Sequence, residues 1–236
     1  MEIKGFVDLS LVDWDGKLSC VIFLPNCNFR CPFCHNTTLV LHPERGETIP
    51  FERVEDYLKK QKDWIDGVCI TGGEPTLHND LPDLCSKLKE IGFLVKVDTN
   101  GTNPKMIKEL MDKSLIDYIA LDIKAPLTAE KYSKATGINT KKLIGKVKET
   151  IKILLGSKMD YEFRTTVVPT LHEEEDIETI CDGVKGCKKY VLQKFDVSLG
   201  KTTIDPAFSK LKPFTDEEIK TFLTTAQESL PNVKLR

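Results

Sequence analysis

Three cysteines within eight residues are the feature of this sequence best suited to chemistry. Cys27, Cys31 and Cys34 stand in a C-x3-C-x2-C spacing directly after an apolar stretch. At this chain's cysteine content, such a triple arises by chance about once in a hundred chains. Soft thiolates in a short loop suit zinc or an iron-sulfur cluster, and three ligands in place of four leave one metal position open.

A structural zinc site is the alternative interpretation of these cysteines. His35 directly follows Cys34 and would complete a closed Cys3His site. Adjacent Cys and His side chains seldom chelate one tetrahedral ion comfortably. We expect the remaining cysteines to be buried as small apolar side chains; they are Cys20, Cys69, Cys85, Cys181 and Cys187.

A Gly-Gly-Glu sequence follows the second apolar run. Gly72 and Gly73 let the backbone approach a ligand closely, and the Glu74 carboxylate can accept hydrogen bonds from a ligand ammonium group. By itself this tripeptide is also compatible with an ordinary turn between a strand and a helix.

Charged residues lie at or near the ends of three later apolar runs. Asp98 and Asp122 could converge on a single cation, and Lys124 could bind an anion. An ordinary turn and a surface lysine remain open as alternatives. Arg164 interrupts an apolar pattern, so its guanidinium must lie at a strand edge or be paired, since an unpaired buried charge is costly.

Short apolar runs alternate with amphipathic stretches along the chain. We predict strands over 19–24, 67–71, 93–99, 116–122, 161–168 and 189–195, and helices over 51–61, 80–90, 104–113, 141–155, 176–183 and 215–230. Apolar strands separated by helices indicate a parallel sheet covered by helices. Six units are too few for a closed eight-unit barrel, so we predict an α/β fold with a partial, open (β/α)6 TIM-like barrel. A doubly wound sheet is the alternative, and either fold places its chemistry at the carboxyl ends of the strands.

The length and net charge of the chain limit its number of domains and its kinds of partner. We expect one domain over residues 1–236, with an N-terminal extension (1–18), the partial barrel (19–197) and a C-terminal loop and helix (198–236). Thirty-four basic and 36 acidic residues give a net charge of -2, which argues against nucleic-acid or membrane partners. The chain has no apolar run of about 18 residues and no signal-peptide pattern, so we expect a cytoplasmic protein.

The cysteine spacing, with Phe33 just before the third cysteine in the loop after the first strand, resembles the radical S-adenosylmethionine (SAM) superfamily. The resemblance implies that Cys27, Cys31 and Cys34 ligate a 4Fe-4S cluster whose fourth iron binds the amino and carboxylate groups of SAM. With SAM bound in this way, Phe33 would pack near the adenine, or equally its ring would fill the core. Gly72, Gly73 and Glu74 match the superfamily motif that holds the methionyl amino group.

Two further motifs resemble the glycyl-radical-enzyme activating enzymes. These are Asp-Thr-Asn-Gly, which begins at Asp98, and Asp-x-Lys, which begins at Asp122. The resemblance implies that Asp98, Thr99 and Lys124 contact SAM and that Asp98 and Asp122 bind a monovalent cation, Na or K. It places Arg164 near the cofactor and assigns no acid, base or nucleophile. The opening stretch is most similar to activating proteins of anaerobic ribonucleoside-triphosphate reductase, although Asn26 stands where that group usually has glycine.

This resemblance implies an anaerobic oxidoreductase that reductively cleaves SAM to a 5′-deoxyadenosyl radical. The expected partner is a glycyl radical enzyme such as anaerobic ribonucleotide reductase, with reduced flavodoxin or ferredoxin as the electron donor. One alternative is radical chemistry on a small molecule, similar to that of the 7-carboxy-7-deazaguanine synthases. A non-catalytic zinc-binding module is the other.

Overall fold

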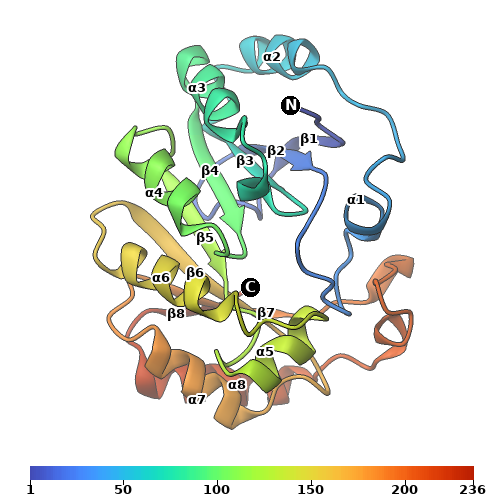
Figure 1. Ribbon diagram of the computed structural model, residues 1–236, viewed down its shortest axis with the longest axis vertical. Helices are drawn as coiled ribbons and strands as arrows, with labels where there is room; N and C mark the ends of the chain where they lie inside the picture. Colours follow the sequence, from blue (N-terminus) through green and yellow to red (C-terminus); the bar gives the residue numbers. More distant parts are fainter. The chain divides into compact units, whose positions relative to one another are not determined.

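The computed structural model describes residues 1–236, except for the side chain of Leu199. The chain forms an α/β fold whose strands follow one another in a single sheet in chain order, from β1 to β8 (Figure 1). The strands are β1 (Gly5–Ser10), β2 (Ser19–Leu24), β3 (Gly67–Gly72), β4 (Leu94–Thr99), β5 (Tyr118–Asp122), β6 (Asp160–Val167), β7 (Tyr190–Lys194) and β8 (Val233–Leu235). The α-helices are α1 (Thr37–Leu41), α2 (Phe51–Lys60), α3 (Leu81–Ile91), α4 (Pro104–Asp112), α5 (Ala129–Thr136), α6 (Ile144–Leu155), α7 (Glu174–Gly183) and α8 (Asp216–Ser229).

All six predicted strands are present as β2 to β7, with bounds within two residues of those expected. The register of β2 and β3 is parallel and runs from Ser19 opposite Gly67 to Leu24 opposite Gly72. Both strands are buried along almost their whole length. That burial explains why they appear in the sequence as continuous apolar runs instead of alternating ones.

The prediction of an open, partial barrel is confirmed. The described strands are mostly parallel, and β1 and β8 are the two ends of the strand order, so the sheet does not close. A doubly wound sheet reverses its strand order at a switch point, whereas the order here follows the chain throughout. The sequence therefore supported the correct choice between the two architectures.

Two strands lie outside the predicted barrel units. β1 pairs antiparallel with β2, and β8 pairs parallel with the start of β7. Three residues of β1 are exposed, and β8 is only three residues long, so neither produces the apolar run of a buried strand. The short helix α5 was also missed, although Thr128 caps its start and Gly137 follows its end.

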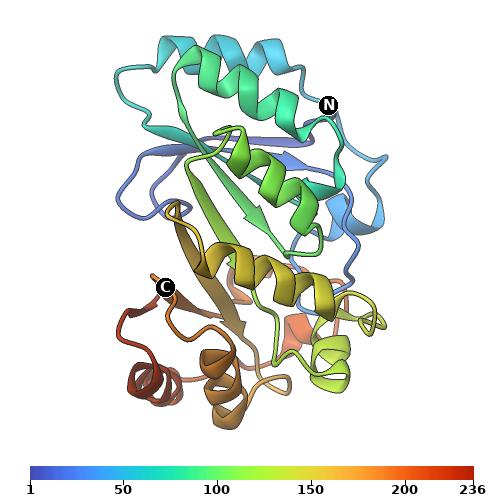
Figure 2. The ribbon, with the colours of Figure 1, turned by 60° about the vertical axis from the view of Figure 1, so that its left-hand side comes forward.

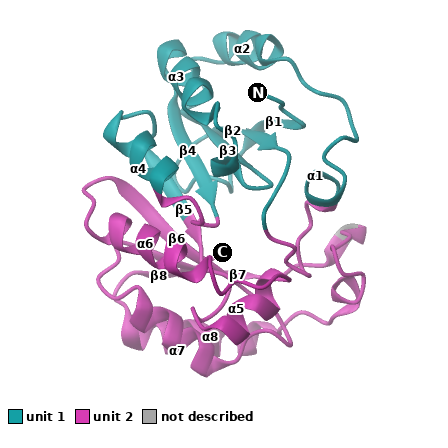
Figure 3. Ribbon diagram, in the orientation of Figure 1, with its two compact units in different colours: residues 1–28, 38–99, 105–120 teal, residues 29–37, 100–104, 121–236 magenta. Residues whose placement is uncertain are grey.

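The chain divides into two compact units (Figure 3). Unit 1 comprises residues 1–28, 38–99 and 105–120, and unit 2 comprises residues 29–37, 100–104 and 121–236. In unit 1, helices α2 and α3 lie side by side on one side of its strands (Figure 2). In unit 2, α7 packs against α8. The division into extension, barrel and C-terminal segment stays a prediction. Among the described residues, no helix is long and apolar enough to span a bilayer.

Helix α8 begins with the capping box that its sequence predicts. The Thr215 hydroxyl accepts a hydrogen bond from the Glu218 main-chain N–H, and the Glu218 carboxylate accepts one from the Thr215 N–H. We expect Thr215→Ala to lower the free energy of unfolding by about 1 kcal/mol, because a main-chain donor loses its acceptor. Urea unfolding measures this loss. Thr224→Ala, on an exposed position of the same helix, is the control, and an equal loss there would contradict the capping role.

Candidate active site

In unit 1, main-chain hydrogen bonds join the loop after β2 to the loop after β3. The Gly73 N–H donates to the Leu24 carbonyl at 2.8 Å, and the Glu74 N–H donates to the Asn26 carbonyl at 2.7 Å. Asn26 has a φ of 66°, in the left-handed region. Asparagine tolerates this conformation better than most residues, so it can stand where the resembling family has glycine.

The two glycines of the Gly-Gly-Glu motif are required by the neighbouring backbone. A Cβ at Gly72, where φ is 120°, would lie 2.3 Å from the Leu24 carbonyl oxygen. A Cβ at Gly73 would lie 1.8 Å from the Asn26 carbonyl oxygen. Both distances are far below van der Waals contact. The glycines therefore allow the segment that leads into Cys27 to lie directly against the segment that carries Glu74, and the two hydrogen bonds hold the segments together.

The Glu74 side chain is buried and held in one orientation. Its Oε1 accepts hydrogen bonds from the Thr76 N–H at 3.1 Å, the Thr76 hydroxyl at 2.5 Å and the Thr99 hydroxyl at 2.7 Å. The structure thus brings together Glu74 and Thr99, which the sequence placed on different strand ends. Sequence reasoning missed Thr76, although its hydroxyl two residues after a loop carboxylate is a common turn pattern.

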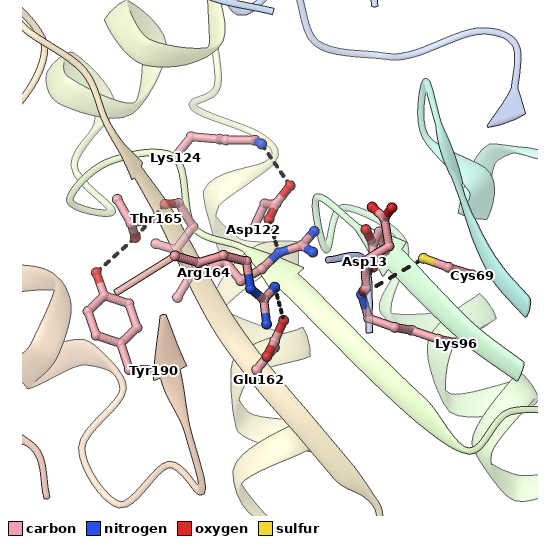
Figure 4. A network of polar contacts seen from close by, with 12 residues as sticks. Asp13, Cys69, Lys96, Asp122, Lys124, Glu162, Arg164, Thr165 and Tyr190 are labelled. Atoms are coloured by element: carbon pink, nitrogen blue, oxygen red, sulfur yellow. Dashed lines mark hydrogen bonds and ion pairs between the residues drawn. The ribbon is translucent and has the colours of Figure 1, made fainter. Parts of the chain in front are cut away.

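Asp98 forms a buried ion pair that was not predicted. Its Oδ1 lies 2.8 Å from Nζ of Lys96, whose side chain is 1% exposed. The Lys96 ammonium also donates to the Asp13 carbonyl and lies 3.8 Å from Sγ of Cys69 (Figure 4). Alternate residues of a strand face the same side, so the spacing of Lys96 and Asp98 was the available signal.

In unit 2, a second group of charges surrounds Asp122. Its Oδ1 accepts from Nε of Arg164 at 2.7 Å, and its Oδ2 accepts from Nζ of Lys124 at 2.9 Å (Figure 4). Burial by itself would raise the pKa of Asp122, but the two neighbouring cations hold it well below its usual range. Burial would lower the pKa of Lys124, but Asp122 raises it. Arg164 is therefore paired, which is one of the two arrangements expected.

His172 supports the main chain beside Lys124 and was missed by sequence reasoning. Its Nδ1 accepts from the Val168 N–H at 3.0 Å, so its Nε2 carries the proton and donates to the Lys124 carbonyl at 2.9 Å. The Thr165 hydroxyl donates to the adjacent Ile123 carbonyl at 2.9 Å. These two hydrogen bonds fix the backbone from which Lys124 extends.

The buried His172 predicts a loss of stability at mildly acidic pH. Burial lowers the pKa of His172 below its usual 6.5, so the unfolded chain takes up this proton first as pH falls. We expect the free energy of unfolding to decrease below about pH 6.5, by at most about 1.4 kcal/mol per pH unit. Carboxyl groups with lowered pKa, such as Asp122 and Glu162, also stabilise the folded protein, but they lose this contribution to the free energy of unfolding only below about pH 4.

Urea unfolding between pH 7.5 and 5 measures this dependence. His172→Gln should flatten the dependence above pH 5, and the exposed His42→Gln should leave it unchanged. Equal slopes in wild type and His172→Gln would contradict the assignment.

The second and third cysteines lie in unit 2. Cys31 is buried and Cys34 partly buried, and the Cys34 N–H donates to the Cys31 carbonyl at 3.0 Å. Burial raises the pKa of the Cys34 thiol, while the Asn36 N–H and the Lys124 ammonium partly oppose this rise. Cys27 belongs to unit 1 and is partly exposed. The other five cysteines are buried, as expected.

The segment after β7 covers part of the cysteine loop. The Ile204 N–H donates to the Cys34 carbonyl at 3.1 Å, and the Asp205 N–H donates to the Pro32 carbonyl at 3.0 Å. Two aromatic side chains of the cysteine loop pack on Phe195. His35 stacks on it with ring centroids 5.7 Å apart, and Phe33 meets it edge to face at 6.3 Å. The observed contact of Phe33 is thus with the protein core.

The donor set of the cysteine loop suits an iron-sulfur cluster. Three thiols within eight residues are soft ligands of a single type. His35, the nitrogen ligand that the zinc alternative requires, stacks on Phe195 and has its Nδ1 3.2 Å from the Thr202 carbonyl. Within the described residues, no three His, Cys, Asp or Glu side chains gather around a point that could hold one metal ion. A cluster requires no such point, because its thiolates bind different irons.

Comparison with known proteins assigns the family. Residues 21–182 match the model of the Radical SAM superfamily. The chain belongs to the radical SAM superfamily. A Methanocaldococcus jannaschii protein named "putative glycyl-radical enzyme activating enzyme" is 37% identical to it over 99% of this chain and 95% of its own length. A second protein of that organism with the same description is 29% identical over 75% of this chain and 67% of its own length.

Solved structures support the fold of this radical SAM protein. Streptococcus suis SuiB, in a crystal structure with bound SAM, superposes with a TM-score of 0.65 over 92% of this chain at 17% sequence identity. The chain spans about half the length of SuiB, with 51% of that protein covered. At this identity the match supports the radical SAM fold and an open barrel, and it carries no information about substrate.

Proposed function

We propose that this radical SAM enzyme is an activating enzyme for a glycyl radical enzyme. The observation that carries the proposal is the 37% identity, over nearly the full length of both chains, to the M. jannaschii protein with that description. Cys27, Cys31 and Cys34 would hold a 4Fe-4S cluster that, when reduced, would supply the one electron needed to cleave the bond from sulfur to C5′ of SAM. The products would be methionine and a 5′-deoxyadenosyl radical, and that radical would take a hydrogen atom from a glycine Cα of the partner.

We propose that Cys27, Cys31 and Cys34 hold the cluster. The fourth iron then remains for SAM, in agreement with the absence of a fourth cysteine from this loop. The strap formed by residues 202–205 supports the assignment for Cys34, because its hydrogen bonds fix the main chain of the loop. A fixed loop holds its thiolates in place before the cluster binds, which reduces the ordering cost of assembly.

We propose that the methionyl end of SAM binds along the Gly72, Gly73 and Glu74 loop. The three hydrogen bonds to Oε1 hold the Glu74 side chain in one orientation, so that its carboxylate can accept from an ammonium group. Asp98 and Thr99 lie at the end of the adjacent strand of the same unit. Phe33 is assigned to the adenine side, with its ring already positioned by Phe195.

In unit 2, we propose that Lys124 and Arg164, the two cations paired with Asp122, contact the cofactor. Asp122 holds both side chains by ion pairs, so their charges are positioned before SAM binds. The ammonium of Lys124 suits a ligand carboxylate. The electron donor is proposed to be reduced flavodoxin or ferredoxin, and the partner a glycyl radical enzyme such as anaerobic ribonucleotide reductase.

The test is anaerobic reconstitution with iron and sulfide, followed by reduction and incubation with SAM and an anaerobic ribonucleotide reductase. We expect release of 5′-deoxyadenosine and an electron paramagnetic resonance doublet from the partner's glycyl radical. If the partner's glycine is deuterated at Cα, the label should appear in 5′-deoxyadenosine.

Two results would count against this function. Release of 5′-deoxyadenosine without any glycyl radical in the partner would contradict activation of that partner and favour a small-molecule substrate. A colourless protein that retains zinc and cleaves no SAM would support the structural metal module instead.

A further inference from the structure

Lys96 provides the positive charge that Asp98 needs. The two side chains lie 2.8 Å apart from N to O, and both are buried. A buried carboxylate requires a cation close to it, and a buried ammonium requires an anion and hydrogen-bond acceptors. Each residue of this pair thus neutralises the charge of the other, although their contact is an ion pair without the geometry of a hydrogen bond.

Two oxygen atoms of the kinds that bind small cations lie against the Lys96 ammonium. A carboxylate oxygen of Asp98 lies 2.8 Å from it. The carbonyl oxygen of Asp13 accepts a hydrogen bond from it, and Cys69 Sγ lies 3.8 Å away (Figure 4). Carboxylate and carbonyl oxygens are the typical ligands of hard cations. A lysine ammonium is itself a compact point charge with three donors, so it can occupy such a place.

Asp122 is also already neutralised by the protein. Its two oxygens are each engaged, one by Arg164 at 2.7 Å and the other by Lys124 at 2.9 Å. A metal ion bound to Asp122 would have to displace one of these cations or lie against both. The arrangement is therefore unfavourable for a monovalent cation.

We infer that Lys96 takes the place of a monovalent cation at Asp98, so that this protein needs neither Na nor K for its stability or for binding SAM. The inference is an alternative to the expectation of a Na or K site at Asp98 and Asp122, and the measurements below decide between them. The statement about SAM binding rests on the proposed function. The statement about stability does not, because it concerns the protein without cofactors.

The first measurement compares the wild-type protein in tetramethylammonium chloride and in potassium chloride at equal ionic strength. We expect the same thermal midpoint and a SAM dissociation constant that changes less than about twofold. A SAM dissociation constant more than about fivefold lower in potassium chloride than in tetramethylammonium chloride would overturn the inference. So would saturable binding of thallium(I), a probe for potassium sites, to the protein without cofactors, if that binding is lost in Asp98→Asn and kept when the three cysteines of the loop are replaced by alanine.

Lys96→Met supplies the second measurement. Without its ammonium, Asp98 should recruit an external cation, so potassium should raise the thermal midpoint of the variant but not that of the wild type. The double variant Lys96→Met/Asp98→Asn, which has no charge to neutralise, should show no potassium response. If Lys96→Met folds and potassium does not raise its thermal midpoint, the inference is overturned. If Lys96→Met does not fold, the wild-type comparison decides.

These outcomes are separable from those of the proposed function. A protein that binds no SAM under any condition would contradict the proposed function. The thermal midpoints and the thallium titration would still decide the role of Lys96.

Discussion

Replacement of Cys31 by alanine is expected to abolish SAM cleavage, because the cofactor supplies the chemistry. A cluster that loses one of its three proposed thiolates binds the protein too weakly to persist through reduction. The measurement is the yield of 5′-deoxyadenosine per protein after anaerobic reconstitution, together with the bound iron and sulfide.

Cys187→Ala is the matched control for this prediction. Cys187 is also buried, but it lies in unit 2 outside the cysteine loop, before β7. It should retain its iron and its activity, with only the stability cost of a small core truncation. Full activity of Cys31→Ala, or equal loss in both variants, would contradict the assignment of the cluster to the loop.

Gly73→Ala is expected to have the largest effect on stability. Its new Cβ would lie 1.8 Å from the Asn26 carbonyl oxygen, and this atom belongs to the backbone and cannot rotate away. The loops after β2 and β3 must separate, which breaks the hydrogen bond between the Glu74 N–H and the Asn26 carbonyl. We expect a loss of about 3 kcal/mol in the free energy of unfolding.

The same substitution should also weaken SAM binding, because the displaced loops carry Glu74 and lead into Cys27. Gly145→Ala is the matched control, since a Cβ there meets no atom within 4 Å. Gly145 lies in helix α6, where alanine is favoured by about 1 kcal/mol, so this control should be neutral or stabilising. Calorimetry and SAM titration measure both effects. Equal stability of the two variants would contradict the proposed packing of the loops.

Local patterns in the sequence were sufficient to predict the central strands. β2, β3 and β4 are buried and parallel, so their apolar residues are contiguous and visible without any knowledge of their neighbours. The edge strands β1 and β8 were missed for the opposite reason. Their pairing with β2 and β7 provides main-chain hydrogen bonds, and those bonds leave little trace in side-chain type.

The residues of the candidate site also fall into those that a local pattern predicts and those that only the fold brings together. The cysteine spacing and the Gly-Gly-Glu motif are local, because each group of residues acts within one loop. Lys96 and Lys124 are each only two residues from their partners Asp98 and Asp122, so their spacing is visible in the sequence, but the third cation is not local. Arg164 reaches Asp122 from β6, 42 residues further along the chain, and a sequence pattern does not specify that approach.

The sequence by itself determined the family, the order of the central elements and the residues proposed to bind the cluster and SAM. These depend on the types and spacing of residues close together in the chain. Only the tertiary structure decided how charge is balanced: Lys96 with Asp98, and Arg164 and Lys124 with Asp122. Charge balance in a buried site depends on distances of a few ångströms between side chains, and folding alone sets those distances.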